Sequence, residues 1–371
     1  MAAGYLDRSR IVALPGWSRW LVPPAALSIH LAIGQAYAWS VFKKPLEISL
    51  GISGVASALP FTLGIVMLGL SAALFGTRVD SNGPRWAMFI SMCCFCSGFL
   101  ISAVGVSTRQ YWLVILGYGV VGGIGLGIGY ISPVSTLIKW FPDRPGLATG
   151  IAIMGFGGGA LIAAPWSNSM LTAFGAIGAQ PDPGGYSDFF PSGTGLAAAA
   201  AGFVAILSLA NMLGRFAWSS TSDVLGRKNI YRMYLGVGAL LYLAVTLTTN
   251  ANKVVFLLCC MLILSFYGAG FATVPAYLRD LFGTYQVGAI HGRLLTAWST
   301  AGVLGPVIVN AIADARIAAG VTGPGRYTLS FLIMIGLLII GFVCNELIRP
   351  VNPRFHEPVS ERAAGKVATA A

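Results

Sequence analysis

Long apolar stretches, about ten of them, fill most of this chain. A helix needs roughly 20 consecutive apolar residues to cross the hydrocarbon layer of a bilayer, and each stretch reaches that length. Hydrophobic residues make up 56% of the 371 positions and charged residues only 9%, so a water-soluble fold could not cover this much apolar surface. The sequence therefore predicts an all-α, polytopic membrane bundle with spans near residues 20–42, 55–77, 86–107, 111–138, 146–174, 195–219, 230–249, 254–278, 287–312 and 327–348.

Positive charges gather at alternate ends of these spans. With the amino terminus placed inside, the inner ends carry most of the lysines and arginines and the outer ends carry few. This asymmetry satisfies the positive-inside rule and predicts a multi-pass protein of a bacterial inner membrane with both termini in the cytoplasm. The net charge of +11 is thus explained by membrane orientation, and nucleic acid is not an expected partner.

Cysteines and glycines give no indication of a metal or cofactor site. All six cysteines fall inside predicted spans, where neither a disulfide framework nor spaced zinc ligands are expected. The glycine-rich runs at 119–129 and 155–159 follow no strand, so they favour close helix contacts over a dinucleotide loop. No cofactor is expected, and the scarcity of clustered acidic or nucleophilic groups at depth argues against an enzyme.

A charged motif occurs twice along the chain. Parallel repeats of six spans are one architecture of secondary transporters, but each repeat here shows only five. This predicts an amino-terminal bundle (1–177), a polar loop at an apparent deletion of two adjacent spans (178–194), a carboxy-terminal bundle (195–350) and a cytoplasmic tail (351–371). The motif Asp80-x-x-Gly83-x-Arg85 recurs as Asp223-x-x-Gly226-Arg227, and Phe141, Gly146, Gly150 and Pro165 recur as Phe282, Gly288, Gly292 and Pro306.

The repeated motif supplies candidate gating residues. In short cytoplasmic connections, a glycine turn and opposite charges can hold neighbouring helix ends together, and breaking those contacts would let the two halves rock. The alternative is a solvated loop with ordinary positive-inside charges. Because the pattern occurs at matched positions, it favours gating by Asp80, Gly83, Arg85, Asp223, Gly226 and Arg227.

Arg215 is predicted to lie inside the membrane, because it precedes Asp223 by eight residues, or about 12 Å of helix. A charge at that depth costs roughly 3 kcal/mol or more unless something neutralises it. The sequence places no Asp or Glu at comparable depth, so the natural counter-ion is a substrate anion held by the guanidinium fork. The alternatives are an arginine that snorkels to the interface or one that pairs with a carboxylate such as Asp223.

His30 is the one further titratable group that the sequence places at depth, where it could carry a proton or bond two helices together. With a single such group, anion exchange or facilitated movement is favoured over proton coupling. Deep aromatic residues could simply pack, or they could enclose a small planar anion and donate hydroxyl hydrogen bonds to it. These residues are Tyr37, Tyr130, Phe156, Tyr267 and Trp298.

Four segments are specific enough to indicate a family: Tyr37-Ala38-Trp39-Ser40-Val41-Phe42, Lys139-Trp140-Phe141-Pro142-Asp143-Arg144, Asn211-x-x-Gly214-Arg215 and Asp280-Leu281-Phe282-Gly283. In these segments the chain resembles the oxalate/formate antiporter family of the major facilitator superfamily. The resemblance implies a twelve-span fold with alternating access to one anion site. It also implies that Arg215 is the substrate arginine, within an aromatic box of Tyr37, Tyr130, Phe156 and Tyr267. The resemblance stops around residues 178–195, where family members carry their sixth and seventh spans.

One position departs from the family pattern. Oxalate exchangers of this family carry a lysine in the penultimate helix, and the matching position here is Trp298. A dianion would lose its second positive partner, so the resemblance implies a monocarboxylate such as formate, pyruvate or lactate better than oxalate.

The missing spans leave two further interpretations open. A truncated, non-transporting remnant is the alternative function, because two helices that line the cavity are absent. Self-association of two copies could cover the open flank. The expected partners are therefore a small organic anion, membrane lipid and a second copy of the chain.

Overall fold

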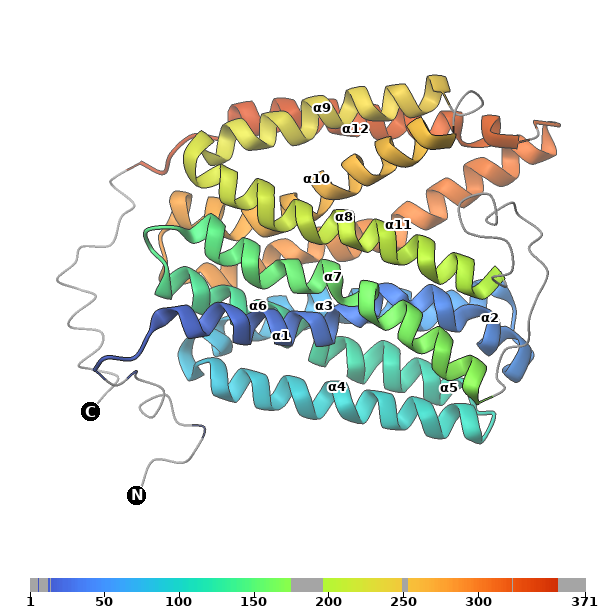
Figure 1. The fold of residues 1–371 in the computed structure, drawn as a ribbon, viewed down its shortest axis with the longest axis horizontal. Coiled ribbons are helices and arrows are strands. Elements are labelled where there is room, and N and C mark those ends of the chain that lie inside the picture. Colours follow the sequence, from blue (N-terminus) through green and yellow to red (C-terminus); the bar gives the residue numbers. More distant parts are fainter. Residues whose placement is uncertain are drawn as a thin grey trace.

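In this computed structural model, residues 15–174, 196–248, 253–321 and 323–352 are described, together with Leu6 and Ala13, and they are mostly helical. The predicted polar loop at 178–194 and most of the predicted tail lie outside these residues. Figure 1 shows an elongated bundle in which the long helices lie roughly along one axis. The beginning of α1 (Val22–Gly34) and the end of α12 (Thr328–Leu347) lie at the same end of the bundle, as an even number of spans requires.

The first half of the bundle contains five spans. The first span is interrupted by a short 3-10 turn, and the fourth contains a π-helical segment, so neither is a straight α-helix throughout. The elements are η2 (Arg19–Leu21), α1, η3 (Gln35–Ala38), α2 (Trp39–Leu50), α3 (Gly54–Asn82), α4 (Pro84–Ser107), α5 (Tyr111–Val114), η4 (Ile115–Gly122), α6 (Gly123–Trp140) and α7 (Pro145–Ala173).

The second half contributes α8 (Leu196–Leu225), α9 (Arg227–Thr248), α10 (Lys253–Phe282), α11 (Val287–Ala318), η6 (Gly323–Tyr327) and α12. Within the described residues, nine helical segments are long and apolar enough to cross a bilayer. Helix α8 adds a tenth, described by its backbone alone over residues 196–203, and it lies beside α7 and α10. The prediction of an all-α membrane bundle of about ten spans is confirmed.

The two most extensive contacts between the halves join α3 to α11 and α7 to α8. Small residues line both contacts, so the helix backbones can approach each other closely. Close packing is needed here because the hydrophobic effect does not drive helices together in lipid. The Ser299 hydroxyl of α11 donates to the Ile65 carbonyl of α3 at 2.7 Å. In α7, Gly150 and Gly157 lie directly against Arg215 of α8. The substrate arginine predicted from the sequence therefore sits on an interface between the halves.

Gly159 provides a test of this close packing, because α7 meets α1 there. A Cβ atom at Gly159 would lie 2.6 Å from the Cα of Gly34 and would collide with its carbonyl carbon, so backbone would have to move. Gly159→Ala is expected to destabilise the folded protein by about 1–3 kcal/mol through overpacking, seen as a lower melting temperature of the detergent-solubilised protein. The matched control is Gly336→Ala in α12, where a Cβ would meet nothing within 4 Å. Equal melting temperatures for the two variants would contradict the packing.

The two halves differ at their outer edges. In the second half, α12 lies along α9 (Figure 1). In the first half, none of the described helices covers the outward side of α4, where four large apolar side chains are exposed: Phe89, Met92, Leu100 and Val104. The repeat relates α4 to α9, and the described residues include no counterpart of α12 beside α4.

Candidate functional site

Arg215 is the centre of the candidate site. Helix α8 holds its side chain between α7 and α10, and none of it is exposed. Its Nε donates to the Asn211 side-chain oxygen at 2.8 Å and its Nη1 donates to the Ile153 carbonyl at 3.3 Å. Its Nη2 has no hydrogen-bond partner, and no ion pair found among the described residues includes this guanidinium. Both alternative interpretations, snorkelling and pairing with Asp223, are therefore wrong.

Aromatic rings enclose the guanidinium. Its central carbon lies 5.6 Å from the ring centres of both Phe156 and Phe271, one contributed by each half. Tyr37 and Tyr130 meet Phe156 edge-on at 5.0 Å and 5.2 Å, and Trp298 meets Phe271 at 5.3 Å. The space between the guanidinium and these rings is too small for a water molecule. The positive charge is consequently removed from solvent, which strengthens its attraction for an anion.

Two of the predicted site residues, Tyr267 and His30, lie apart from this cluster. Tyr267 does not line the space around Arg215; it accepts a hydrogen bond from Trp298 Nε1 at 2.9 Å, and 41% of its surface is exposed. His30 lies behind Tyr130, with its ring 5.4 Å away, and not beside the guanidinium. The structure thus gathers Tyr37, Tyr130, Phe156 and Trp298 around Arg215, and it leaves Tyr267 and His30 one contact further out.

Sequence reasoning missed three residues of the site. Phe271 and Leu295 line the space around Arg215, and Phe271 follows Tyr267 by one helical turn, a spacing that could have indicated it. His291 was also missed: the prediction that only His30 lies at depth was wrong, because His291 is 2% exposed and its ring lies 5.9 Å from Tyr130. Its place near the start of a span made it look peripheral, but α3 and α6 bury that part of α11.

Asp223, at the end of α8, binds the first turn of α7 in the other half. Its two carboxylate oxygens accept hydrogen bonds from the backbone amides of Gly146 at 2.9 Å and Leu147 at 2.7 Å. A carboxylate at a helix amino terminus satisfies free amides and complements the positive end of the helix dipole. Arg227 pairs with Asp223 and also with Asp280, at 3.2 Å.

Asp80, at the equivalent end of α3, makes the mirror contact with the second half. It accepts from the Ala289 amide in the first turn of α11 at 3.1 Å, from the Ser135 hydroxyl at 2.6 Å and from Lys139 at 2.6 Å. Asp80 and Asp223 are called the clamp aspartates below, and the end of the bundle that holds them the clamp end. Each clamp aspartate joins its own half to the other.

The remaining motif residues have different roles in the two repeats. Gly83 and Gly226 adopt φ values of 89° and 84°, a conformation that glycine adopts at little cost, and each ends a helix there. Arg227 is almost fully buried among the clamp contacts, whereas the side chain of Arg85 is exposed. The sequence therefore identified both aspartates, but not the backbone amides of the opposite half that they bind.

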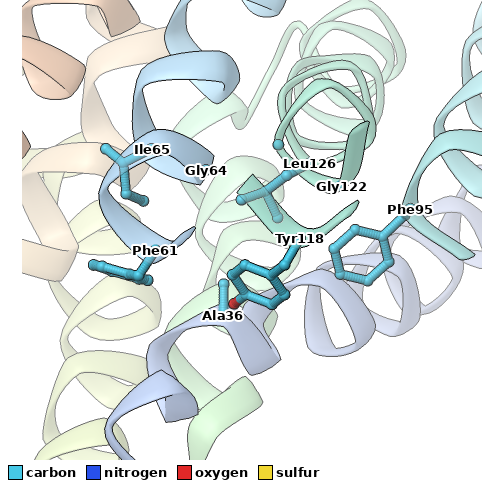
Figure 2. Close-up of a pocket in the computed structure, with 9 residues that line it drawn as sticks. Ala36, Phe61, Gly64, Ile65, Phe95, Tyr118, Gly122 and Leu126 are labelled. Carbon is cyan, nitrogen blue, oxygen red and sulfur yellow. The ribbon is translucent and has the colours of Figure 1, made fainter. Parts of the chain in front are cut away.

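A second enclosed space lies between α3, α4, η3 and η4. Figure 2 shows the ring of Tyr118 beside Ala36, with Phe61 and Phe95 on either side of it in this view. The void is about the size of a single water molecule, and no charged side chain lines it. It lacks the positive charge that a carboxylate site needs.

The fold and the clamp geometry can be compared with known proteins. A sequence profile described as Major Facilitator Superfamily matches residues 189–371. The structure of a proton:xylose symporter, XylE, bound to 6-bromo-6-deoxy-D-glucose, superposes with a TM-score of 0.65 over 88% of this chain and 94% of that chain, at 12% identity. The chain has the major facilitator fold, and its residues 189–371 match the sequence profile of that superfamily. This facilitator is therefore a multi-pass membrane protein with the fold of membrane transporters.

Two sequence relatives are more similar to the facilitator than the symporter is. The oxalate:formate antiporter of Oxalobacter formigenes is 25% identical over 411 residues, covering 93% of this chain and 94% of the relative, and supports the oxalate/formate antiporter family. An MFS-type transporter of Escherichia coli, YhjX, is 31% identical over 146 residues, which span 39% of this chain and 35% of that protein. The alignment with the antiporter has 411 positions, but it uses only 93% of the 371 residues of this chain. On the order of 65 positions of the antiporter therefore have no matching residue here. That number is enough for two spans and a connection.

Proposed function

We propose that this facilitator moves small monocarboxylate anions, such as formate, pyruvate or lactate, across the membrane by alternating access. The observation that carries the proposal is the fully buried guanidinium of Arg215, which has a free Nη2 and no ion partner among the described residues. A buried charge without a counter-ion is costly, so a bound anion would recover much of that cost. A carboxylate also matches the guanidinium fork in shape and charge.

The two halves share this site, which is what alternating access requires. Phe156 comes from the first half, whereas Arg215 and Phe271 come from the second, so rocking of the halves would open the ring cluster on one side. The clamp aspartates would hold the clamp end closed and release it once per cycle. The positive-inside pattern supports a cytoplasmic clamp end, cytoplasmic termini and location in a bacterial inner membrane.

Trp298 supports a monoanion as the cargo. Its indole occupies the position at which the resemblance places a second cation, and its Nε1 hydrogen is already donated to Tyr267. Among the described residues that line the space, Arg215 alone carries a charge. One carboxylate can be neutralised there, while the second charge of oxalate would stay unpaired in a closed, apolar site.

Counterflow tests the proposal directly. Proteoliposomes loaded with one unlabelled carboxylate would be mixed with labelled formate, pyruvate, lactate or oxalate, and protein-free liposomes would correct for permeation of the free acid. Monocarboxylates are expected to exchange faster than oxalate. Absence of counterflow with every anion would favour the second candidate, a non-transporting remnant, which is motivated by the open side of α4 and the exposure of Tyr267. Crosslinking in native membranes would separately test self-association.

Trp298→Lys is expected to shift selectivity toward the dianion. A lysine would supply the second positive partner, and one charge-assisted hydrogen bond is worth about 1.5–3 kcal/mol, or roughly tenfold or more in relative affinity. The ratio of oxalate to formate counterflow measures the effect. Trp298→Gln is the control, since it removes the ring without adding charge. A ratio that rises equally in both variants would show that space, and not charge, sets the selectivity.

A further inference from the structure

Three buried polar side chains form a row beside the anion site. Tyr130 stands in the middle, with the ring of His30 at 5.4 Å and the ring of His291 at 5.9 Å. His30 is fully buried, and His291 and Tyr130 are 2% and 3% exposed. The three residues belong to α1, α6 and α11, so the row includes residues of both halves.

Two atoms of this row have no hydrogen-bond partner. The Nδ1 atom of His30 lies 2.9 Å from the Ala26 carbonyl oxygen, which can only accept, so Nδ1 carries the hydrogen. In the neutral ring the lone pair then lies on Nε2, and Nε2 is buried without a partner, as is the Tyr130 hydroxyl. Buried polar atoms are nearly always paired. The rings of His30 and Tyr130 are in contact and each residue has one unpaired polar atom, which indicates a function beyond packing.

His291 extends the row toward the clamp end. It lies two residues beyond Ala289, whose amide donates to Asp80. The charged groups around the row are Arg215 of α8, which acts electrostatically on His30, and Asp80 of α3 with Lys139 of α6, next to the first turn of α11. On α11 itself, Arg293 is exposed. From α7, Gly155 lies against His30, and the apolar ring of Phe156 contacts Tyr130.

We propose that one proton crosses with each anion, bound by His30 and His291 in turn, with the side chain of Tyr130 between them. This inference rests on the proposed function. The guanidinium of Arg215 opposes a second positive charge on His30, and a carboxylate bound at Arg215 removes that opposition. Anion binding therefore favours proton binding, and the reverse holds by linkage. The imidazole takes one proton from water on one side and returns it on the other, and no other bond changes.

The test compares two fluxes in the same proteoliposomes. One is counterflow of labelled pyruvate at equal pH on both sides, and the other is net pyruvate uptake driven by an acidic exterior, corrected with protein-free liposomes. Wild-type protein is expected to show both, with a stoichiometric loss of external protons. In His30→Gln, His291→Gln and Tyr130→Phe, net uptake is expected to fall at least tenfold more than counterflow. The control is Ser28→Ala, an exposed residue on the same helix as His30, which should leave the ratio unchanged.

The outcomes separate the two proposals. Wild-type counterflow without any gradient-driven uptake would overturn the proton proposal and leave the carboxylate transporter standing. An unchanged ratio in His291→Gln or Tyr130→Phe would also overturn it, even if His30→Gln failed to fold. Absence of counterflow in wild-type protein would instead refute the transport function, and the proton proposal would fall with it.

Discussion

Arg215→Ala is expected to lower carboxylate counterflow by on the order of 100-fold or more. Removing the charged partner of a desolvated, hydrogen-bonded pair costs about 2–5 kcal/mol, and each 1.4 kcal/mol is a factor of ten. The substitution also leaves the Asn211 side-chain oxygen and the Ile153 carbonyl without their present donor. Arg215→Lys should retain the charge but lose the planar fork, so flux should fall by about tenfold.

Initial counterflow rates of purified protein in liposomes measure this effect. Arg316→Ala is the matched control, because that arginine is exposed near the far end of α11 and a charge is again removed. Both variants should elute as a single species in detergent. Counterflow that persists in Arg215→Ala at more than half of the wild-type rate would refute the assignment of the anion site.

Asp223→Asn is expected to open the clamp end. Asparagine keeps the shape of the side chain but turns one acceptor oxygen into an NH2 group, which would face the Gly146 or the Leu147 amide. Arg227 would keep Asp280 but lose its charged partner on α8. A hydrogen bond to a charged group contributes about 1.5–3 kcal/mol, so the equilibrium between closed and open clamp should shift by roughly 10- to 150-fold. Transport should fall accordingly, because a cycle needs both states.

Hydrogen exchange at the amides of residues 146–150 measures the opening, since Asp223 protects the first turn of α7. Asp143→Asn is the control: Asp143 is at the same end, but its pair with Arg19 is exposed, and such pairs contribute little. Faster exchange in Asp223→Asn alone is the expected result. Equal exchange in both variants would show that Asp223 does not close the clamp end.

Much of the fold was predictable because the bilayer imposes a simple rule on the sequence. The apolar stretch at 146–174 corresponds to α7 (Pro145–Ala173), and the stretch at 287–312 to the first part of α11 (Val287–Ala318). The first span was harder, since α2 continues to Leu50 past Lys43 and Lys44. Long basic side chains can lie along a helix end and reach water, so they do not mark where the helix stops.

The site was only partly predictable. Arg215 could be identified because a charge inside an apolar stretch is conspicuous. Phe271 and His291 could not be identified in the same way, since aromatic residues are common in spans and the depth of a side chain depends on which helices pack beside it. The same reason explains why Tyr267, predicted as part of the box, is half exposed.

The sequence by itself determined the number of spans, the repeat, the positions of the clamp aspartates and the buried arginine, because each follows from the cost of placing charge or free backbone in hydrocarbon. Only the tertiary structure decided the partners. It shows that Asp80 and Asp223 bind helix amino termini of the opposite half, and that His291 lies beside Tyr130. Such contacts join residues far apart in the chain, and helix packing brings them together without any periodic signal in the sequence.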